Sequence, residues 1–504
     1  MKRIFNISVY ALVLAVSVSC NDYLDVMPDN RTELDTPEKI TSILVSAYAN
    51  ATSLCMQEMM SDNVSDYGTT RDVNYSIFEE AYRFDDITDD SFDSPTELWR
   101  YTYSAIACAN LALEAIENLG GGESLNPQKG EALLCRAYGH FCLVNAFCQA
   151  YNTVSSSSDL GIPYVTEPES TVFVERSRET VADVYRKIAA DIEAGFPLID
   201  DGNYTHPKYH FNTTAAAAFA AQFYLYYGDY DKAEEYATMA LGEDPTIYFR
   251  NWDLYTGTTA DEYKQVYNSS EEQANFMGHG FRSRFMRYRS GRYFMTRDIT
   301  VNETINGPTP WGAMSSSSSA NPRIPYATAY QSSSIYYYSP KITEYFLYTD
   351  QVAGTGYPYL VIQVFTSEKT MIDRAEANAM LGFYDDAARD LNYFYHSLGF
   401  TVTLSASDIA DYYADAEYNN PVMAPRGLVF ADATQENLVK ACLHARRLMT
   451  VQEGTRLNDL KRYGIAYTHT IDGEAPVEIA PYDLRLAIQL PVTVLSAGLE
   501  ANPR

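Results

Sequence analysis

The chain of 504 residues has little of what membrane-spanning, metal-binding and nucleic-acid-binding proteins need. After its first twenty residues, no apolar run reaches the roughly eighteen residues that a membrane-spanning helix requires. Its seven histidines are scattered, and none stands with cysteines at the spacing of zinc ligands. With 37 Lys and Arg against 66 Asp and Glu, its net charge of −29 repels phosphate backbones. We therefore predict no membrane span after residue 20, no metal or other cofactor, and no nucleic-acid partner.

Cysteine is also scarce, and its positions argue against a disulfide framework. Apart from Cys20, the cysteines lie within apolar helical patterns and show no C-x-x-C spacing: Cys55, Cys108, Cys135, Cys142, Cys148 and Cys442. Cys135 and Cys142 stand two helical turns apart, which is too far for a bond between them. We expect most of these cysteines to be small buried apolar groups.

Tryptophan is rare and tyrosine is abundant, with three and 43 residues respectively. Tyr has a flat apolar face, a polar tip and few torsions to freeze, which suits contact with sugars or peptides. Many of these tyrosines must still belong to the core. Because sugar-binding platforms often contain Trp, the composition slightly favours a peptide ligand and leaves a glycan open.

The first twenty residues have the features of an export signal. Lys2 and Arg3 precede an almost unbroken apolar stretch over residues 4–18, which is too short to span a membrane and ends in small residues. Cys20 follows, at the position where bacterial lipoproteins are cleaved and acylated, although Ser17 stands where Leu is usual. We predict a signal peptide over residues 1–19 and a lipid anchor on Cys20, with an ordinary secreted protein as the alternative. Stable anchoring takes more than one acyl chain.

Most of the remaining chain has helical periodicity. Blocks with apolar residues at helical spacing cover about 97–119, 127–150, 180–198, 213–241 and 374–387. Ser94-Pro95 precedes the first block as a typical N-terminal cap. The pair over 213–241 has tetratricopeptide-like spacing around a Gly-Asp turn, and the pair that begins at Arg374 repeats it. With further pairs over 98–150 and 437–460, we predict about four helical hairpins that form a curved, mostly α scaffold.

The pattern changes between about residues 244 and 340. This segment lacks helical periodicity and is rich in Tyr, Ser, Arg and Gly, with successive tyrosines from Tyr336 to Tyr338. Long irregular insertions on a rigid scaffold often carry binding functions. A disordered serine-rich loop is the alternative, but the interleaved aromatic and Arg residues argue against it.

A series of short motifs runs in order along nearly the whole chain. They are Cys20-Asn-Asp-Tyr-Leu-Asp25, Glu58-Met-Met-Ser-Asp62-Asn63, Leu98-Trp99-x-x-x-Tyr103-x-x-Ile106-x-x-x-Asn110, Glu131-Ala-Leu-Leu-Cys-Arg136-Ala137, Gly228-Asp-Tyr-Asp-Lys-Ala233, Arg374-Ala-Glu-Ala, Glu453-Gly454-x-Arg456-x-x-Asp459-Leu-Lys-Arg462 and the terminal Asn502-Pro503. In this order, and after a lipoprotein start, they resemble the SusD/RagB family of outer-membrane nutrient-binding lipoproteins of Bacteroidetes.

One of these motifs departs from the family pattern. Around Glu-Gly-x-Arg the family usually has His and Trp, where this chain has Thr455 and Leu457. Arg456, Asp459 and Arg462 are spaced for buried or partly buried charge pairs. We therefore interpret this segment as structural.

The resemblance implies one SusD-like domain over residues 20–504, with a mostly α fold of tetratricopeptide-like hairpins and long irregular loop insertions. It also implies a surface-exposed protein that is lipid-anchored to the cell outer membrane. Such proteins form a hinged lid on a SusC-like TonB-dependent barrel and trap an oligosaccharide or oligopeptide for import. No catalysis belongs to the family.

Family members bind ligands through the loop after Ser-Asp-Asn and through the large insertion. The resemblance places ligand contacts in these two segments on Asp62, Asn63, Asp66, Tyr67, Arg71, Asn74, Trp311, Tyr336 and Tyr337. The loop 62–75 combines carboxylates, amides and flat rings, which suit sugar hydroxyls or peptide backbones. For Asp62 and Asn63, a purely local role in turns fits equally well.

The remaining candidate aromatic and basic residues have two interpretations each. Trp311 lies in Gly-Pro-Thr-Pro-Trp-Gly, which is typical of an exposed turn where it could stack on a ligand. Trp99 occupies an apolar helical stripe and is expected in the core, whereas Trp252 fits either place. A basic run comprises Arg282, Arg284, Arg287, Arg289, Arg292 and Arg297. It either attracts an acidic ligand or pairs with the chain's own carboxylates, and the second is favoured.

Two other classes of function stay open. A secreted glycoside hydrolase needs two carboxylates at a defined separation across a sugar, and adjacent acids such as Asp85-Asp86 do not produce that geometry. Neither G-x-S-x-G nor H-E-x-x-H occurs in the chain. A helical-repeat scaffold for protein partners would bind a barrel but no small ligand.

Overall fold

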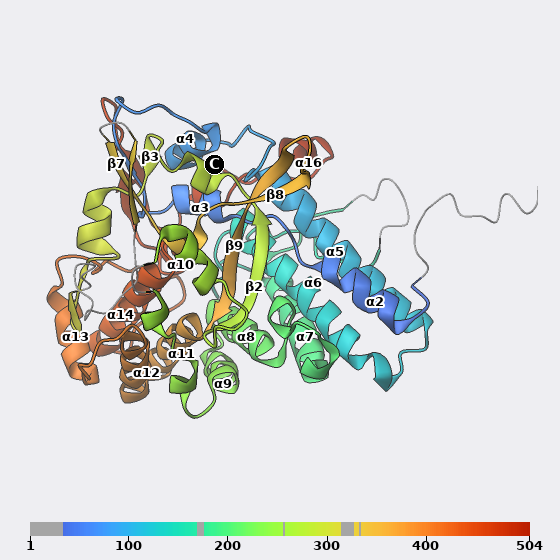
Figure 1. The fold of residues 1–504 in the computed structure, drawn as a ribbon. Helices are drawn as coiled ribbons and strands as arrows, with labels where there is room; N and C mark the ends of the chain where they lie inside the picture. Colours follow the sequence, from blue (N-terminus) through green and yellow to red (C-terminus); the bar gives the residue numbers. More distant parts are fainter. Residues whose placement is uncertain (1–33, 169–175, 256–257, 314–326, 332–333) are drawn as a thin grey trace, which may run out of the picture.

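The computed structural model describes residues 34–168, 176–255, 258–313, 327–331 and 334–504. This part is mostly helical, with small antiparallel sheets between helical layers (Figure 1). The predicted mostly α scaffold is therefore confirmed. Cys20 and the signal peptide lie outside the described residues. Across the described ranges, no helix combines the length and apolar character needed to cross a membrane.

The α-helices cover the scaffold from end to end. They are α2 Pro37–Leu44, α3 Leu54–Met59, α4 Ser76–Arg83, α5 Pro95–Asn118, α6 Asn126–Phe147, α7 Val181–Gly195, α8 Thr213–Tyr227, α9 Tyr230–Leu241, α10 Ala260–Tyr267, α11 Ser367–Leu381, α12 Tyr384–Ser397, α13 Ala406–Asp415, α14 Ala433–Met449, α15 Arg456–Arg462 and α16 Val492–Ser496. In Figure 1, α2, α5 and α6 lie on one side, α13 and α14 on the other, and α8, α9, α11 and α12 along the bottom.

The helices pack as antiparallel hairpins where the sequence predicts them, with one exception. The pairs α5–α6, α8–α9 and α11–α12 match the predicted pairs. The fourth hairpin is different: α14 packs mainly against α13, not against the helix that follows it. The prediction of a pair over 437–460 was therefore wrong, because α15 is only seven residues long and cannot cover α14.

Local sequence sets the ends of these helices. The Ser94 hydroxyl accepts a hydrogen bond from the backbone N–H of Glu97 at 3.2 Å, which caps α5 as predicted. Gly228 follows α8 with φ +80°, a left-handed conformation that favours glycine. Asp229 then caps α9 through the N–H of Lys232. A Gly-Asp dipeptide thus ends one helix and starts the next within two residues.

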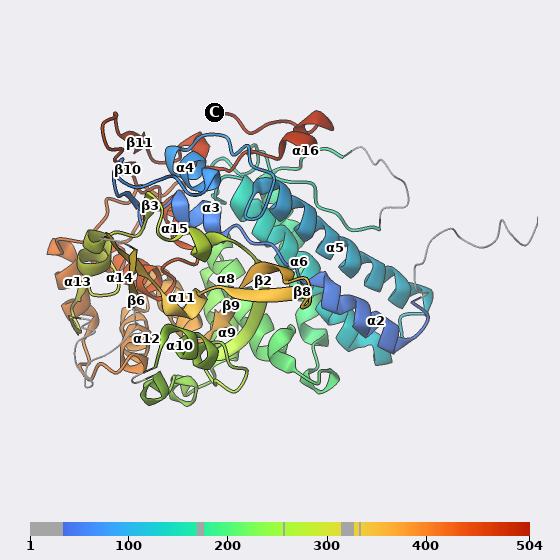
Figure 2. The ribbon, with the colours of Figure 1, turned by 45° about the horizontal axis from the view of Figure 1, so that its top comes forward.

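Short strands fill the space between the helices. They are β1 Ser65–Asp66, β2 Asn275–Arg282, β3 Tyr293–Phe294, β4 Pro308–Thr309, β5 Gly312–Ala313, β6 Ala327–Gln331, β7 Ser334–Tyr338, β8 Tyr345–Asp350, β9 Thr355–Thr366, β10 Tyr467–His469 and β11 Val477–Ile479. The sheet β2–β9–β8 is antiparallel and packs on α8 and α11 (Figure 2). Its central strand β9 runs directly into α11.

The segment 244–340 is more regular than the sequence suggests. It contains α10 and the eight-residue strand β2. The first half of β2 is buried on both faces, so its residues show no alternation of polar and apolar side chains. The structured part of this segment therefore had no periodic signal in the sequence.

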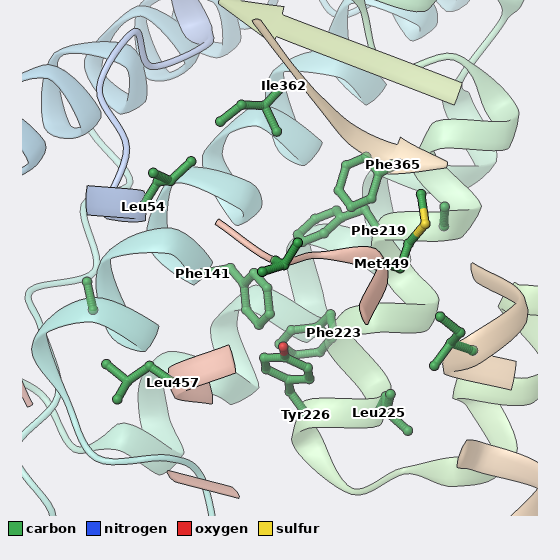
Figure 3. Close-up of a cluster of buried hydrophobic side chains, with 14 of the residues drawn as sticks. Leu54, Phe141, Phe219, Phe223, Leu225, Tyr226, Ile362, Phe365, Met449 and Leu457 are labelled. Atoms are coloured by element: carbon green, nitrogen blue, oxygen red, sulfur yellow. The ribbon is translucent and has the colours of Figure 1, made fainter. Parts of the chain in front are cut away.

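The largest ring cluster of the core lies where α6, α8 and β9 meet (Figure 3). Phe219 of α8 is fully buried, and its ring contacts Phe141 at 5.7 Å and Phe365 at 6.0 Å between centroids. Leu54, Met449 and Leu457 come from three other helices and belong to the same cluster. This cluster joins segments from both ends of the chain.

The cysteines and Trp99 are placed as predicted. Cys55, Cys135, Cys148 and Cys442 are buried, and no disulfide forms among the described cysteines. Trp99 packs against the core, with its ring 5.4 Å from that of Phe147. Trp252, whose place was open, is partly buried and donates to the Ser397 carbonyl at 2.5 Å.

We expect Phe219→Ala to lower the free energy of unfolding by about 3–5 kcal/mol, because it removes a fully buried ring and leaves a cavity. Urea unfolding followed by circular dichroism measures this. Phe383→Ala is the matched control, since that side chain is 54% exposed and its loss should change stability by less than about 0.5 kcal/mol. Equal losses for the two variants would contradict the position of this core.

Candidate ligand-binding face

The start of the predicted binding loop is held by buried arginines of the C-terminal motif. Both Asp62 carboxylate oxygens accept from Arg456 at 2.8 Å, and the Asn63 side-chain oxygen accepts from Arg447 at 2.8 Å. Burial alone would raise the pKa of Asp62, but Arg447 and Arg456 bring it well below its ordinary value. Asp62 and Asn63 therefore serve to fix the loop.

Asp66 has a similar structural role one turn later. Its carboxylate forms a fork with Arg292 at 2.8 and 2.6 Å and also accepts from the backbone N–H groups of Gly68 and Asp472. The side chain is 2% exposed. Both carboxylate oxygens therefore already have hydrogen-bond donors within the chain. The pairing of β1 with β3 brings Asp66 opposite Tyr293, the residue after Arg292.

Trp311 is not in an exposed turn, and that prediction was wrong. The residue is 3% exposed, stacks on Tyr395 of α12 at 3.9 Å between ring centroids, and donates to the Asn392 side chain at 2.8 Å. A Gly-Pro-rich turn predicts a change of chain direction but says nothing about which element covers it. Packing by α12 accounts for the burial, and no ring face remains for a ligand.

The other predicted residues come together on one side of the molecule. The Arg71 guanidinium lies 3.4 Å from the centroid of the Tyr67 ring and donates to the Ile335 carbonyl at 2.9 Å. Loop 62–75 therefore meets β7, which carries Tyr336 and Tyr337. Tyr336 and Tyr338 share one face of that strand, and the Arg289 guanidinium lies 5.6 and 5.1 Å from their rings. We call Tyr67, Arg71, Arg289, Tyr336 and Tyr338 the arginine–tyrosine face.

Two further contacts complete the surroundings of this face. Asn74 is exposed, and its side-chain amide lies beside Gly291. A Cβ atom placed on Gly291 would be 3.6 Å from the amide nitrogen of Asn74. Tyr67 donates to the Met295 carbonyl at 2.7 Å, and burial raises its pKa to about 12 against the opposing effect of Arg71. Tyr67 therefore stays neutral and is fixed in place, while Asn74 remains open to solvent.

A second group of rings, which the sequence did not indicate, lies on the β8–β9 hairpin. Phe346 and Tyr348 are 36% and 55% exposed, and their rings meet at 4.8 Å between centroids. The Arg282 guanidinium lies 5.0 Å from the Tyr357 ring and 4.6 Å from the Phe92 ring. We call Phe346, Tyr348 and Tyr357 the aromatic hairpin. Alternating aromatic residues in Tyr345-Phe-Leu-Tyr348 were the available signal.

The basic run lies between the two groups, and three of its six arginines pair with carboxylates, so the interpretation favoured from the sequence holds for half of the run. Arg287 pairs with Glu344 at 2.5 Å, Arg292 with Asp66 at 2.6 Å, and Arg282 with Glu97 at 3.6 Å. Arg287 also lies 5.9 Å from the Phe346 ring, beside the aromatic hairpin. Arg289, two residues later, contacts the other group. The segment 282–292 therefore contacts both sets of rings, of which those of the hairpin are exposed and those of β7 are buried.

The aromatic hairpin combines exposed rings with the nearby Arg287, which suits stacking on sugar rings and hydrogen bonding to their oxygens. Tyr336, Tyr337 and Tyr338 are buried, at 8–9% exposed, and present no open ring face. The interior offers less room. A cavity of about 140 Å³ lined by Gln57, Asn145 and Lys369 is below the roughly 300–1,000 Å³ of ordinary ligand pockets. A larger hollow of about 800 Å³ lies between α2 and α5, away from the predicted ligand residues. Among the described residues, no group of three or more His, Cys, Asp or Glu side chains is arranged to hold a metal ion.

We expect Asp62→Asn to lower the free energy of unfolding by about 3 kcal/mol, because it leaves Arg456 without its buried partner. The pKa of Asp62 is below its unfolded value near 3.9, so its contribution is present above about pH 4 and is lost at lower pH. Chemical unfolding at pH 7 and pH 3 measures both effects. The exposed Asp85→Asn is the control, and equal stability of the two variants would return Asp62 to the candidate ligand contacts.

The comparisons with known proteins agree with this architecture. A family model for SusD-like proteins, described as starch-binding and associating with the outer membrane, matches residues 22–225. A SusD superfamily protein from Bacteroides thetaiotaomicron is 18% identical, covers 94% of this chain and 100% of its own, and has a TM-score of 0.62.

Two further solved structures share the fold. A SusD-like carbohydrate binding protein from Bacteroides vulgatus is 17% identical over 92% of this chain and 96% of its own, with a TM-score of 0.60. A SusD superfamily protein from Parabacteroides distasonis is 14% identical over 92% and 98%, with a TM-score of 0.59. No curated protein matches the chain. The family model matches the first part of the chain, and the solved structures show that the chain has the fold of SusD superfamily proteins over nearly all of its length.

Proposed function

We propose that this protein captures oligosaccharides at the cell surface and passes them to a SusC-like TonB-dependent transporter in the outer membrane. The observation that carries the proposal is the exposed pair of rings on the aromatic hairpin, Phe346 and Tyr348, with Arg287 beside them. Exposed rings are costly to leave in water, and rings beside hydrogen-bond donors are the ordinary means of holding sugars. In this proposal the protein binds and performs no reaction.

The scaffold supports a surface of this kind. The hairpin is part of the β2–β9–β8 sheet, and β9 continues into α11, so the rings are attached to the helical core. Loop 62–75 is fixed to α14 and α15 through Arg447 and Arg456. A ligand would meet groups that are already positioned, which lowers the entropy lost on binding.

The comparisons favour a carbohydrate over a peptide. The matching family is described as starch-binding, and one protein of the same fold carries the name carbohydrate binding protein. The low Trp content, which slightly favoured a peptide, has less weight because Tyr and Phe rings are exposed on the hairpin. We propose Tyr67, Arg71 and Asn74 as ligand contacts, together with the rings of the hairpin. Tyr336 and Tyr337 are 8% and 9% exposed, so they support the surface from beneath and offer no ring face to a ligand.

We expect Tyr348→Ala to weaken oligosaccharide binding about tenfold, because it removes an exposed stacking surface worth about 1–1.5 kcal/mol. Isothermal titration of the purified full chain in detergent, against maltoheptaose, xylohexaose and tetragalacturonate, measures this. Tyr209→Ala is the matched control, since Tyr209 is 50% exposed and lies outside both groups of rings.

The outcomes of this titration separate the competing functions. Binding of a mixed peptide pool in place of sugars would favour an oligopeptide-capture protein. Failure of every sugar and peptide, with retained binding to a barrel partner, would favour the protein-binding scaffold. Release of smaller sugars from the panel would revive the hydrolase.

The proposed anchor and partner have their own test. We expect Cys20→Ser to move the protein from the outer-membrane fraction to the soluble fraction, because no acyl chain can then be attached. Cell fractionation and immunoblotting measure this, with Cys108→Ser as the control. We also expect a TonB-dependent barrel to copurify with the wild-type protein. Unchanged fractionation of Cys20→Ser would argue against the anchor.

A further inference from the structure

We propose that the ligand of the arginine–tyrosine face carries negative charge, and that it is an acidic oligosaccharide bearing carboxylate or sulfate groups. This inference rests on the proposed function and makes its ligand class specific. It is drawn from two guanidinium groups, those of Arg71 and Arg289, which lack a carboxylate partner in a chain with 66 acidic residues.

Arg71 has only neutral neighbours. It stacks on the Tyr67 ring and donates to the Ile335 carbonyl, and no described carboxylate lies within 4 Å of its guanidinium. The residue is partly exposed. A guanidinium has five N–H donors in a fixed plane, and the Nη1 atom of Arg71 is buried without a hydrogen-bond partner among the described residues.

Arg289 has the same kind of environment. It donates to the Met286 carbonyl at 2.6 Å and lies against the rings of Tyr336 and Tyr338, again without a carboxylate within 4 Å in the described part of the chain. Arg71 and Arg289 meet β7 at consecutive residues, Ile335 and Tyr336. The two cations therefore contact the same short piece of strand.

The carboxylates closest in the chain are engaged elsewhere. Asp66 is taken by Arg292, and Glu344 by Arg287. Asp72 is exposed to solvent and forms no ion pair with either free guanidinium. At physiological salt the Debye length is about 8 Å, so the distant acids that make up the net charge act weakly here. Burial raises the pKa of Tyr338, Arg289 lowers it and Asp261 raises it, so an acidic group also acts on this face, although it pairs with neither arginine.

Two planar cations on one strand match the acidic groups of a sugar. A uronate carboxylate or a sulfate group accepts two parallel N–H···O bonds from a guanidinium. A neutral sugar offers hydroxyl groups only, and its bonds to the same donors are weaker. The expected order of affinity is therefore acidic oligosaccharide over neutral oligosaccharide of equal length.

The test compares tetragalacturonate and a chondroitin sulfate tetrasaccharide with maltotetraose, by titration of the full chain in detergent. We expect an acidic probe to bind at least about tenfold more tightly than maltotetraose. Raising NaCl from 50 to 500 mM should weaken the acidic complex about tenfold and leave the neutral one nearly unchanged. Both acidic probes carry uronate carboxylates, so tighter binding of chondroitin sulfate than of tetragalacturonate would assign the added affinity to sulfate.

Variants assign the effect to the two arginines. Arg289→Gln and Arg71→Gln should each reduce acidic affinity about tenfold, and Arg289→Lys, which keeps the charge without the fork, should have an intermediate effect. Arg186→Gln is the matched control, because Arg186 is an exposed arginine of α7 paired with Asp183. Circular dichroism melting confirms that each variant is folded.

The possible results separate this inference from the function beneath it. Equal or tighter binding of maltotetraose, or acidic binding that is insensitive to both arginine variants, would overturn the acidic ligand and keep oligosaccharide capture. Binding of none of the three probes, nor of the wider sugar panel, would count against capture itself.

Discussion

Two adjacent arginines of α14, Arg446 and Arg447, hold the two ends of the chain together. Arg446 pairs with Asp373 and Glu376 of α11 and with Asp459 of α15, at 2.6 to 3.1 Å. Arg447 instead binds the Asn63 side chain and the Asp62 carbonyl, at 2.8 and 2.9 Å. Because both guanidinium groups are buried, every contact that they make must be kept or a charge is left unpaired. The scaffold and the binding loop therefore share one fixed support.

This support specifies position more than it adds stability. Buried ion pairs often cost nearly as much to desolvate as they return, whereas removing one partner is strongly destabilising. The stabilising term comes from the ring cluster around Phe141, Phe219 and Phe365, which buries apolar surface in the same region. The buried ion pairs of α14 then select one relative position of the helices among those that would pack equally well. A loop that presents side chains to a ligand is positioned more precisely when its first residues are held in place by the scaffold.

The sequence predicted most of the scaffold and only part of the binding surface. Helical hairpins have a periodic apolar pattern, and their helices begin or end at local signals such as Ser94 and Gly228-Asp229. The position of each helix can therefore be predicted from residues that are close in the sequence. The charge pairs of Arg456, Asp459 and Arg462 were also indicated, by their spacing. The fourth hairpin was misplaced because the choice of α13 over α15 as partner depends on contacts between distant segments.

The binding surface was harder to predict because burial is decided by tertiary contacts. Asp66 and Trp311 had suitable chemistry for a ligand, yet Arg292 covers one and α12 covers the other. The aromatic hairpin was missed for the opposite reason, since Phe346 and Tyr348 read as ordinary strand residues until the strand is found at the sheet edge.

The charge balance of the surface completes this picture. Most described arginines of this acidic chain contact a carboxylate, and those contacts build the fold, as Arg292 does with Asp66. An arginine that stacks on a tyrosine and donates only to backbone carbonyls adds little to the fold and retains its donors. Arg71 and Arg289 are of this second kind, and both reach β7 beside residues that the family resemblance assigns to the ligand. Since unpaired cations in a chain of net charge −29 could readily have found acidic partners, their position on the candidate surface is best explained by an anionic partner from outside the chain.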